Sequence, residues 1–402
     1  MDQLISRKEY LNQLEMWREK DMIKVVTGVR RCGKSTLFDL FIEKLKATGV
    51  AEEQIVYVNF EDADFFDLLD YSQLHEYVKT RIVKDKWTYV FLDEIQNCID
   101  YEKAVSSLYL KKNVDIYMTG SNAYMLSGEL ATKLAGRYIE IDMLPLSFKE
   151  YSEAVKTQDK HERFIQYMNM GAFPYTVRLK DNSIANSQYL EGLYNTVLVK
   201  DIMTRKNLKD ITLLKSIARF LADNIGSPVS VKKIADTLTS GGRPTGSATV
   251  ETYLEALCEA YIFYKINRYD IKGKMHLKTD SKFYICDTGL RNMIIGTANR
   301  DIGRQIENIV FLELLRRGSS VYIGKSGRET EVDFVLNGNN KIEYYQVAAS
   351  VLDENTLSRE LKPLLYIKDN YPKYLITLDE FSGDYDGIQQ INLYDWLMKN
   401  EP

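Results

Sequence analysis

The stretch IKVVTGVRRCGKST at residues 23–36 decides the fold of this 402-residue chain. Ile23–Thr27 is apolar enough for a buried strand, and from Leu37 onward apolar residues recur at helical spacing. Between them lies the spacing G-x-x-x-x-G-K-S, which in this strand–loop–helix context is typical of a phosphate-binding loop. Glycines let the backbone approach phosphate oxygens, and successive N–H groups form an anion cradle at the helix start. The residues expected to bind nucleotide phosphates are Gly28, Arg30, Arg31, Gly33, Lys34, Ser35 and Thr36.

The second half of the predicted site is an apolar stretch that ends in two acids, Asp93 and Glu94. We expect Lys34 to reach the β- and γ-phosphates, and the Ser35 hydroxyl and Asp93 to hold Mg²⁺. Glu94, directly after Asp93, is expected to polarise the attacking water, so Lys34 and Glu94 are both candidate catalytic residues. This order of motifs indicates an NTPase of the additional-strand class, because the sequence has no NKxD motif for guanine recognition.

Two further apolar stretches predict strands of the same sheet. Residues 114–119 are followed by Ser121 and Asn122, which are candidates to touch the γ-phosphate or the water; an ordinary strand-to-loop turn is the alternative. Residues 55–60 are followed by Glu61 and Asp62, which either line the same crevice or are solvated loop acids. Strands alternating with helices predict an α/β fold with a parallel, doubly wound sheet and the nucleotide at the strand ends.

A series of motifs in a fixed order resembles the prokaryotic AAA-type ATPases. In that family an ATPase core precedes a C-terminal half described mainly as a domain of unknown function, and the resemblance covers nearly the whole chain. It implies ATP and Mg²⁺ as ligands and, because such sites often lie at subunit boundaries, a homo-oligomer. The motifs are GVRRCGKST (28–36), YVNFED (57–62), FLDEIQ (91–96), TGSN (119–122), SGELATKLAGRY (127–138), PLSFKEY (145–151), GAFP (171–174), VKDI (199–202), YICDTGL (284–290) and QIENIV (305–310).

The resemblance also draws attention to arginines. Arg137 is a candidate arginine finger, in cis or from a neighbouring subunit, that would stabilise transition-state charge; the alternative is a salt bridge that orders the segment from Pro145. Arg30 and Arg31 are candidates for the same role in cis, and their alternative is solvation or pairing with Glu61 or Asp62.

Composition excludes several classes of protein. The net charge is −4, with four scattered cysteines, only three histidines and no uncharged apolar run near 18 residues. We therefore expect a cytoplasmic protein without a disulfide framework, structural zinc or membrane span. Residues 200–282 carry 15 Lys and Arg against 9 Asp and Glu, whereas both flanks are acidic. This basic middle is a candidate polyanion contact, unless it is only a fluctuation in surface charge.

The pattern of residues 211–285 predicts a winged helix-turn-helix. Helical stretches at 213–224, 231–238 and 248–260 precede two strand-like stretches around a basic loop. The predicted third helix carries Glu251, Glu255 and Glu259, which would repel phosphate, so a protein-contact module is the alternative to DNA binding. The candidate contacts with duplex DNA, within residues 232–278, are Lys232, Lys233, Arg243, Lys272 and Lys274.

The final third, residues 286–402, resembles a small α/β restriction-endonuclease-like fold. Glu307 and Asp333 match the helical acid and the strand acid that hold Mg²⁺ in such nucleases. The E-x-K slot instead contains Gln346 and Ala348, which lack the charge and the amine that the chemistry needs. We therefore expect this domain to be catalytically inactive.

These observations predict a chain of several parts. We expect an AAA-type ATPase core at 1–150, a helical lid or connector at 151–210, a winged helix at 211–285 and the nuclease-like domain at 286–402. The predicted function is Mg²⁺-dependent ATP binding and hydrolysis that couples nucleotide state to DNA contact. A nucleotide-dependent switch whose C-terminal half binds a protein partner is the alternative, and an ATP-gated nuclease is less expected.

Overall fold

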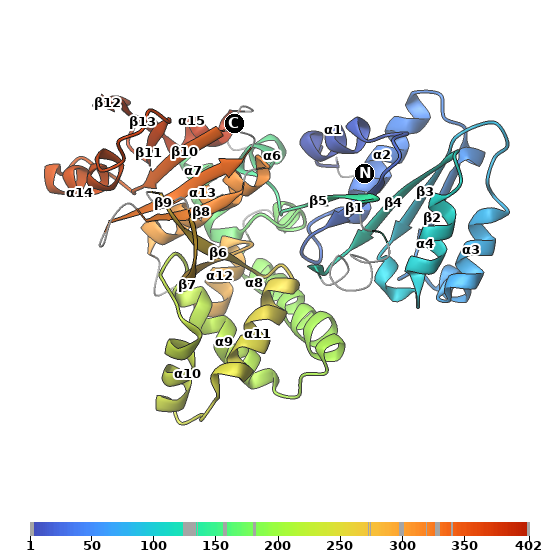
Figure 1. Ribbon diagram of the computed structural model, residues 1–402, viewed down its shortest axis with the longest axis horizontal. Helices are drawn as coiled ribbons and strands as arrows, with labels where there is room; N and C mark the ends of the chain where they lie inside the picture. Colours follow the sequence, from blue (N-terminus) through green and yellow to red (C-terminus); the bar gives the residue numbers. More distant parts are fainter. Residues whose placement is uncertain are drawn as a thin grey trace. The chain divides into compact units, whose positions relative to one another are not determined.

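The computed structural model describes residues 4–123, 134, 136–155, 159–179, 182–271, 273, 275–296, 301–318, 320–325, 330–338 and 341–399. The chain divides into two compact units (Figure 1). Unit 1 is Met1–Leu144 with Glu259–Tyr261, and unit 2 is Pro145–Cys258 with Ile262–Pro402. No helix among the described residues has the length and apolarity needed to cross a membrane.

Unit 1 contains, within its described residues, a parallel five-stranded sheet in the order β2-β3-β4-β1-β5. Parallel strands need crossover connections, and helices supply them. The strands are β1 (Ile23–Thr27), β2 (Ile55–Asn59), β3 (Thr88–Asp93), β4 (Val114–Gly120) and β5 (Tyr138–Asp142). The helices are α1 (Lys8–Met16), α2 (Lys34–Ala47), α3 (Tyr71–Lys79) and α4 (Tyr101–Tyr109).

Helices cover both faces of this sheet, because successive strand residues point to opposite sides. On one face, Val90 and Leu92 of β3 join a core with Leu74 of α3 and Val105 of α4. On the other face, Phe91 of β3 packs against aromatic residues of α2 and β4: its ring lies 5.2 Å from Phe38, 6.3 Å from Phe41 and 4.7 Å from Tyr117. The result is an α/β/α layering that leaves the carboxyl edge of the strands for the loops.

Unit 2 consists of helices around a mixed sheet. The described helices are α6 (Phe148–Ala154), α7 (Lys160–Met170), α8 (Ser183–Thr196), α9 (Ile211–Asp223), α10 (Val231–Ser240), α11 (Ser247–Glu259), α12 (Thr288–Ile295), α13 (Ile302–Arg316), α14 (Glu354–Leu365) and α15 (Leu393–Met398). A π-helical segment, Val197–Thr204, continues directly from α8.

The described part of unit 2 has an eight-stranded sheet in the order β12-β13-β11-β10-β9-β8-β6-β7. Its strands are β6 (Phe263–Asp270), β7 (Met275–Ile285), β8 (Val321–Lys325), β9 (Glu331–Gly338), β10 (Lys341–Val347), β11 (Lys373–Thr377), β12 (Gly383–Tyr385) and β13 (Ile388–Asn392). Strand β6 pairs with β7 on one side and, in parallel, with β8 on the other. The sheet is therefore continuous across residue 285, where the sequence suggested a boundary.

Helices α9, α10 and α11 precede the β6–β7 hairpin in the order expected from the sequence (Figure 1). An isolated antiparallel bridge joins Val229, just before α10, to Ser281 of β7. Apolar residues on one side of α9, including Leu214, Ile217 and Leu221, are fully buried. The strong amphipathic pattern of α9 thus packs this group of elements into one core.

Candidate functional site

The loop between β1 and α2 lies at the carboxyl edge of the sheet in unit 1. Gly28, Arg31 and Gly33 have φ angles of +142°, +66° and +107°, so the loop turns through backbone conformations that favour glycine. At Gly28 a Cβ atom would lie 2.2 Å from the carbonyl oxygen of Met143, which excludes any larger residue without a backbone shift. Helix α2 begins at Lys34, directly after Gly33. The N–H groups of its first turn therefore point toward the loop, where an anion could accept from them.

Lys34 and Glu94 meet inside this edge. The Lys34 amine donates to the carbonyls of Gly28 and Val29 at 3.0 and 3.3 Å and lies 3.7 Å from a Glu94 carboxylate oxygen. Burial alone would raise the pKa of Glu94, but Lys34, a hydrogen bond from Gln96 and the charge of Arg30 hold it below its ordinary value. Glu94 is therefore an ionised, almost fully buried carboxylate at neutral pH.

Asp93 ends β3 and is completely buried. The Thr119 hydroxyl donates to one of its oxygens at 2.5 Å and the Tyr57 hydroxyl donates to the other at 3.1 Å, while the nearby Ser35 hydroxyl also acts to lower its pKa. Burial raises the pKa of Asp93, and these hydrogen bonds oppose the shift. The structure thus brings the two expected metal ligands, Ser35 and Asp93, close together.

The arginines of the loop differ from each other. Arg30 is buried, and its guanidinium donates to Glu61 at 2.5 Å, which is the pairing weighed as the alternative for this residue. Arg31 is exposed, and Thr36 lies in the first turn of α2. Asp62 caps the short helix Ala63–Leu68 through the N–H of Asp64.

Asn122 and Ser121 directly follow β4, and both are buried at the same edge as Asp93. Strand β4 lies between β1, which leads into the loop, and β3, which ends in Asp93, so its carboxyl end lies between these two parts of the site. The residue that contacts both acids is Thr119, which the sequence analysis did not select. Its hydroxyl accepts from the Glu94 N–H at 2.8 Å as well as donating to Asp93.

Arg137 lies at the opposite edge of the sheet. Its carbonyl accepts from the N–H of Ile23, the first residue of β1, and its guanidinium lies over the Tyr109 ring at 5.5 Å. Five strand residues separate Ile23 from the loop, about 16 Å, which an arginine side chain cannot span. Arg137 therefore does not reach the loop of its own chain, and only its action in trans stays a prediction.

Sequence reasoning missed three side chains of this site in all: Tyr57, Gln96 and Thr119. Each lies inside a motif that was noted, YVNFED, FLDEIQ or TGSN, but each was passed over for a neighbouring acid or amide. The available signal was strand periodicity, because Tyr57 and Asn59, two positions apart, lie on the same side of β2.

The metal-binding capacity of this edge is limited. In the part of the chain that the structure describes, no group of three or more His, Cys, Asp or Glu side chains converges on a metal position. The oxygen atoms of Ser35 and Asp93 are the hard ligands that Mg²⁺ prefers, and Mg²⁺ commonly takes its remaining ligands from phosphates and water. The residues present therefore fit a metal that arrives with a nucleotide.

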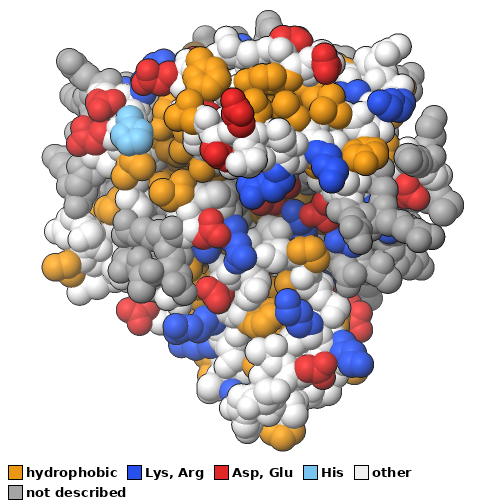
Figure 2. Space-filling model, turned by 90° about the vertical axis from the view of Figure 1, so that its left-hand side faces the viewer, with side chains coloured by type: hydrophobic (Ala, Val, Ile, Leu, Met, Phe, Trp, Pro, Cys, Tyr) orange, Lys and Arg blue, Asp and Glu red, His pale blue; other side chains and the backbone are white. Residues whose placement is uncertain are grey.

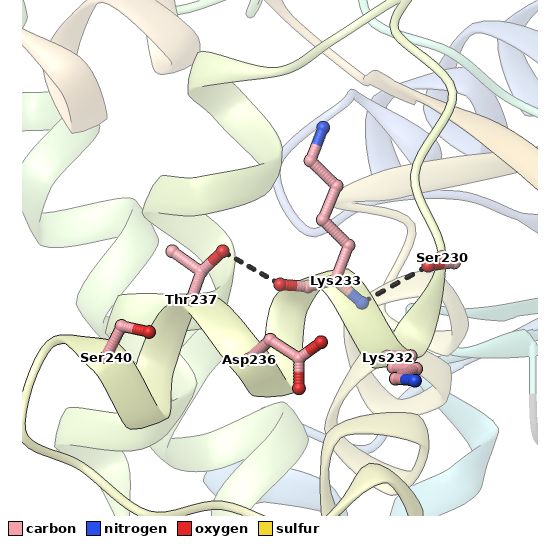
Figure 3. Close-up of a pocket in the computed structure, with 6 residues that line it drawn as sticks. All are labelled: Ser230, Lys232, Lys233, Asp236, Thr237 and Ser240. Carbon is pink, nitrogen blue, oxygen red and sulfur yellow. Dashed lines mark hydrogen bonds between the residues drawn. The ribbon is translucent and has the colours of Figure 1, made fainter.

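The candidate DNA contacts are spread over α10 and the turn after it. Lys232 and Lys233 are exposed in the first turn of α10 and line an open hollow with Ser230, Asp236, Thr237 and Ser240 (Figure 3). Lys233 extends away from Asp236 in this view. Among the described residues on the face shown in Figure 2, Lys and Arg side chains are interspersed with Asp and Glu and form no continuous basic surface.

The remaining candidates for DNA contact are less available. Arg243 donates twice to Asp210, at 2.8 and 2.7 Å, and so already has an anionic partner. Glu251 and Glu255 are exposed on α11. Lys272 and Lys274 lie outside the described residues.

The residues that match the nuclease pattern come together around a lysine. The Lys282 amine lies 3.2 Å from Glu307, 2.9 Å from Glu331 and 3.8 Å from Asp333. Burial lowers the pKa of Lys282, but the three carboxylates outweigh that effect and raise it.

The E-x-K slot beside this cluster serves structural contacts. The Gln346 amide donates to Glu360 at 2.8 Å and accepts from the Asp333 N–H at 3.4 Å, while Ala348 is buried. An ammonium group thus already lies among the carboxylates that would otherwise hold a metal.

Comparisons with known proteins support the division seen in the structure. A family model of an AAA domain matches residues 20–152, and a model of a domain of unknown function matches residues 161–301. An uncharacterized protein of Haemophilus influenzae is 42% identical over 403 residues, covering 98% of this chain and 99% of that protein. The uncharacterized protein MJ1544 of Methanocaldococcus jannaschii is 31% identical over 361 residues, covering 85% of this chain and 77% of that protein.

A solved structure shares the fold. The Walker-type ATPase PABY2304 of Pyrococcus abyssi superposes with a TM-score of 0.53 at 14% identity, covering 72% of this chain and 96% of that chain. At this identity the likeness concerns the fold alone.

Proposed function

Because this chain belongs to the family of AAA-domain proteins that includes its Haemophilus influenzae and Methanocaldococcus jannaschii relatives, we propose that it binds ATP with Mg²⁺ and hydrolyses it. The observation that carries the proposal is the meeting of Lys34, Ser35, Asp93 and Glu94 at one edge of the sheet. These side chains come from two segments about 60 residues apart, and the strand order joins them.

Each of these residues has a role in the proposal. The N–H groups of the loop and of the first turn of α2 hold the phosphates, and Lys34 supplies a positive charge beside them. Ser35 and Asp93 hold Mg²⁺, which when bound neutralises charge on the phosphate oxygens. Glu94 orients and polarises the attacking water, and Asn122 lies at the same edge to contact the water or the γ-phosphate.

The source of transition-state stabilisation is part of the proposal. Arg30 belongs to the loop of the same chain and would act in cis, but its guanidinium would have to leave Glu61 to reach the phosphates. Arg137 would act on the site of a neighbouring copy in a homo-oligomer. Comparing the molecular mass with and without ATP decides whether Arg137 can act in trans, because only an assembled protein permits such action.

Two substitutions test ATP binding and hydrolysis separately. Lys34→Ala should abolish or greatly weaken ATP binding, whereas Lys46→Ala on the exposed side of the same helix should not. Glu94→Gln should bind ATP but hydrolyse it about a hundredfold more slowly or worse, because an amide cannot accept the proton of the water. Titration with a fluorescent ATP analogue and a phosphate-release assay measure both effects. Unchanged ATP affinity in Lys34→Ala would refute the assignment.

We further propose that unit 2 couples nucleotide state to duplex DNA through a winged helix formed by α9, α10, α11 and the β6–β7 hairpin. Its support is the element order, the bridge from Val229 to Ser281, and the exposed Lys232 and Lys233. The exposed acids of α11 favour phosphate contact through α10 rather than base recognition by α11. A protein partner on the same surface is the alternative.

A salt series distinguishes these two partners. DNA held by lysine–phosphate contacts should weaken steeply as salt rises, and Lys232→Ala with Lys233→Ala should reduce that slope by about 2. Lys160→Ala, which removes an exposed lysine paired with Asp395, is the matched control. Fluorescence anisotropy with a labelled duplex measures the slope, and a flat salt response would favour the protein partner.

The last part of the proposal is that the strands after β7, with α13 and α14, form a nuclease-like domain that has no nuclease activity. Its support is the Lys282 ammonium inside the carboxylate cluster and the Gln346 and Ala348 side chains in the E-x-K slot. Metal-dependent cleavage assays should detect no cut DNA.

A further inference from the structure

Arg7 lies one residue before α1 and is almost fully buried, with 3% of its surface exposed. Its guanidinium donates to the carbonyl of Cys32 at 3.0 Å and to the carbonyl of Leu144 at 2.7 Å. The same group lies over the Tyr10 ring at 4.8 Å, and the Tyr10 hydroxyl accepts from the Leu144 N–H at 3.1 Å. A buried charge is thus directed at the backbone of the phosphate-binding loop.

The bond to Cys32 determines the direction of the next N–H group. A trans peptide is planar, so the carbonyl of Cys32 and the N–H of Gly33 point in opposite directions. When Arg7 holds this carbonyl toward α1, the Gly33 N–H faces away from Arg7. Lys34, which follows Gly33, begins α2, so this peptide is the last one before the helix.

The loop has few other means to hold this peptide. Arg31 and Gly33 flank Cys32 with left-handed backbone angles, so no regular helix or strand ladder extends through them. The Cys32 N–H donates to the Val29 carbonyl at a long 3.3 Å. The Arg7 guanidinium is itself held by Leu144, whose carbonyl accepts from Arg7 and whose N–H donates to the Tyr10 hydroxyl.

We propose that Arg7 is a positioning residue for nucleotide binding, which holds the Cys32–Gly33 peptide so that the Gly33 N–H is directed at the phosphates. The inference rests on the proposed ATP binding and adds a residue that lies outside every motif of the site. A preorganised N–H contributes to holding phosphate before any chemistry occurs. Its loss should therefore change affinity for ATP and ADP more than turnover of the bound complex.

The chain offers a matched control for a purely structural role. Arg18 donates to the Tyr89 hydroxyl at 3.1 Å and to Glu19 at 3.0 Å, and lies over the Tyr89 ring at 5.5 Å. Like Arg7, it flanks α1 and lies over an aromatic ring. Tyr89 lies near the start of β3, however, at the end opposite to Asp93.

The test uses the full chain with Arg7→Met, Arg7→Lys and Arg18→Met. We expect Arg7→Met to raise the dissociation constant for a fluorescent ATP analogue, and the KM, about tenfold or more, the loss of one charge-assisted hydrogen bond. The kcat should stay within about threefold. Arg7→Lys should recover part of the affinity, because an ammonium can still bond the Cys32 carbonyl but cannot form a planar bridge to Leu144. Arg18→Met should lower the melting temperature and leave the dissociation constant unchanged.

Each outcome separates this inference from the function on which it rests. If the parent protein binds ATP and both Arg7 variants bind it equally well, Arg7 is only structural and the inference is wrong. An equal loss of affinity in Arg18→Met would also overturn it, because general destabilisation would then explain both. If Arg7→Met does not fold, Arg7→Lys decides. A parent protein that binds no ATP would overturn the proposed function itself.

Discussion

Thr119 shows how one hydroxyl can orient two acids. It is completely buried at the end of β4, donates to Asp93 and accepts from the N–H of Glu94. Glu94 has a φ angle of +54°, a conformation that non-glycine residues seldom adopt without support. The hydroxyl therefore stabilises the turn that directs the Glu94 side chain toward Lys34.

This contact predicts the behaviour of Thr119→Val. Valine keeps the shape but leaves the Glu94 N–H without this acceptor, so ATP hydrolysis should fall about tenfold or more and stability by about 1–3 kcal/mol. Phosphate release and chemical unfolding measure the two effects.

Thr88→Val is the matched control for that prediction. Thr88 is equally buried at the other end of β3, where its hydroxyl accepts from the Val83 N–H. Its loss should lower stability without slowing hydrolysis of bound ATP. Equal hydrolysis rates in the two variants would show that Thr119 does not support hydrolysis by orienting Glu94.

At the scale of elements, Asp287 joins the start of α12 to the loop after α7. Its two oxygens accept from the N–H groups of Leu290 at 2.7 Å and Ala172 at 2.5 Å. Gly171 is required beside it, because a Cβ there would lie 2.4 Å from an Asp287 oxygen. One buried carboxylate thus holds two of the family motifs together.

Burial raises the pKa of Asp287 to about 6 from its ordinary value of 3.8, although backbone hydrogen bonds oppose the shift. Between these values the folded protein binds more protons than the unfolded chain, so stability falls as pH rises from about 4 to 6. The total loss is about 3 kcal/mol. Asp287→Asn should remove this part of the pH dependence, as urea midpoints across pH 4.5–7.5 would show.

The control for that series is Asp301→Asn. Asp301 caps α13 through the Arg304 N–H from an exposed position. The Asp301→Asn variant changes a helix cap without removing a buried acid, so it separates the effect of a lost cap from that of the buried carboxyl group. A wild-type slope unchanged by Asp287→Asn would contradict the prediction.

Much of the element pattern was predictable from the sequence. The apolar runs of β1, β3 and β4 identify the strands, and the motifs that follow them identify Lys34, Asp93 and Glu94. Parallel strands align their carboxyl ends, so these residues could be expected to meet. Assignment of functional roles to them is still a prediction.

Other features could not be predicted because they depend on partners distant in sequence. Lys24 lies within the apolar strand β1 yet is fully buried, paired with Asp115 of β4. Nothing local distinguishes the π-helical segment Val197–Thr204 from an α-helix. Arg7 gained its role only because the fold brings Cys32 and Leu144 to it.

At the scale of the whole molecule, the sequence suggested separate modules where the structure of unit 2 has one continuous sheet. Strand β6 belongs to the hairpin beside α11, but its other edge pairs in parallel with β8. The register joins Arg268 to Ile323 and Asp270 to Lys325. Charge and motif boundaries do not report such pairing, because hydrogen bonds between strands leave no mark on composition.

This pairing predicts that a chain ending at Cys286 will not fold properly. Removing β8 leaves the inner edge of β6 without partners, and an exposed edge of this kind promotes association. We expect aggregates on size-exclusion chromatography and no cooperative unfolding of the remaining part of unit 2. A chain ending at Lys399 is the control, and a monodisperse, cooperatively unfolding 1–286 fragment would contradict the prediction.

The same pairing has a consequence during biosynthesis. Strand β6 ends at Asp270 and its partner β8 begins at Val321, so about 50 further residues must be translated before the two can meet. At typical rates of synthesis this takes roughly 3–10 s. For that interval every newly made chain carries an open strand edge, which makes β6 a natural point for a ribosome-associated chaperone to protect.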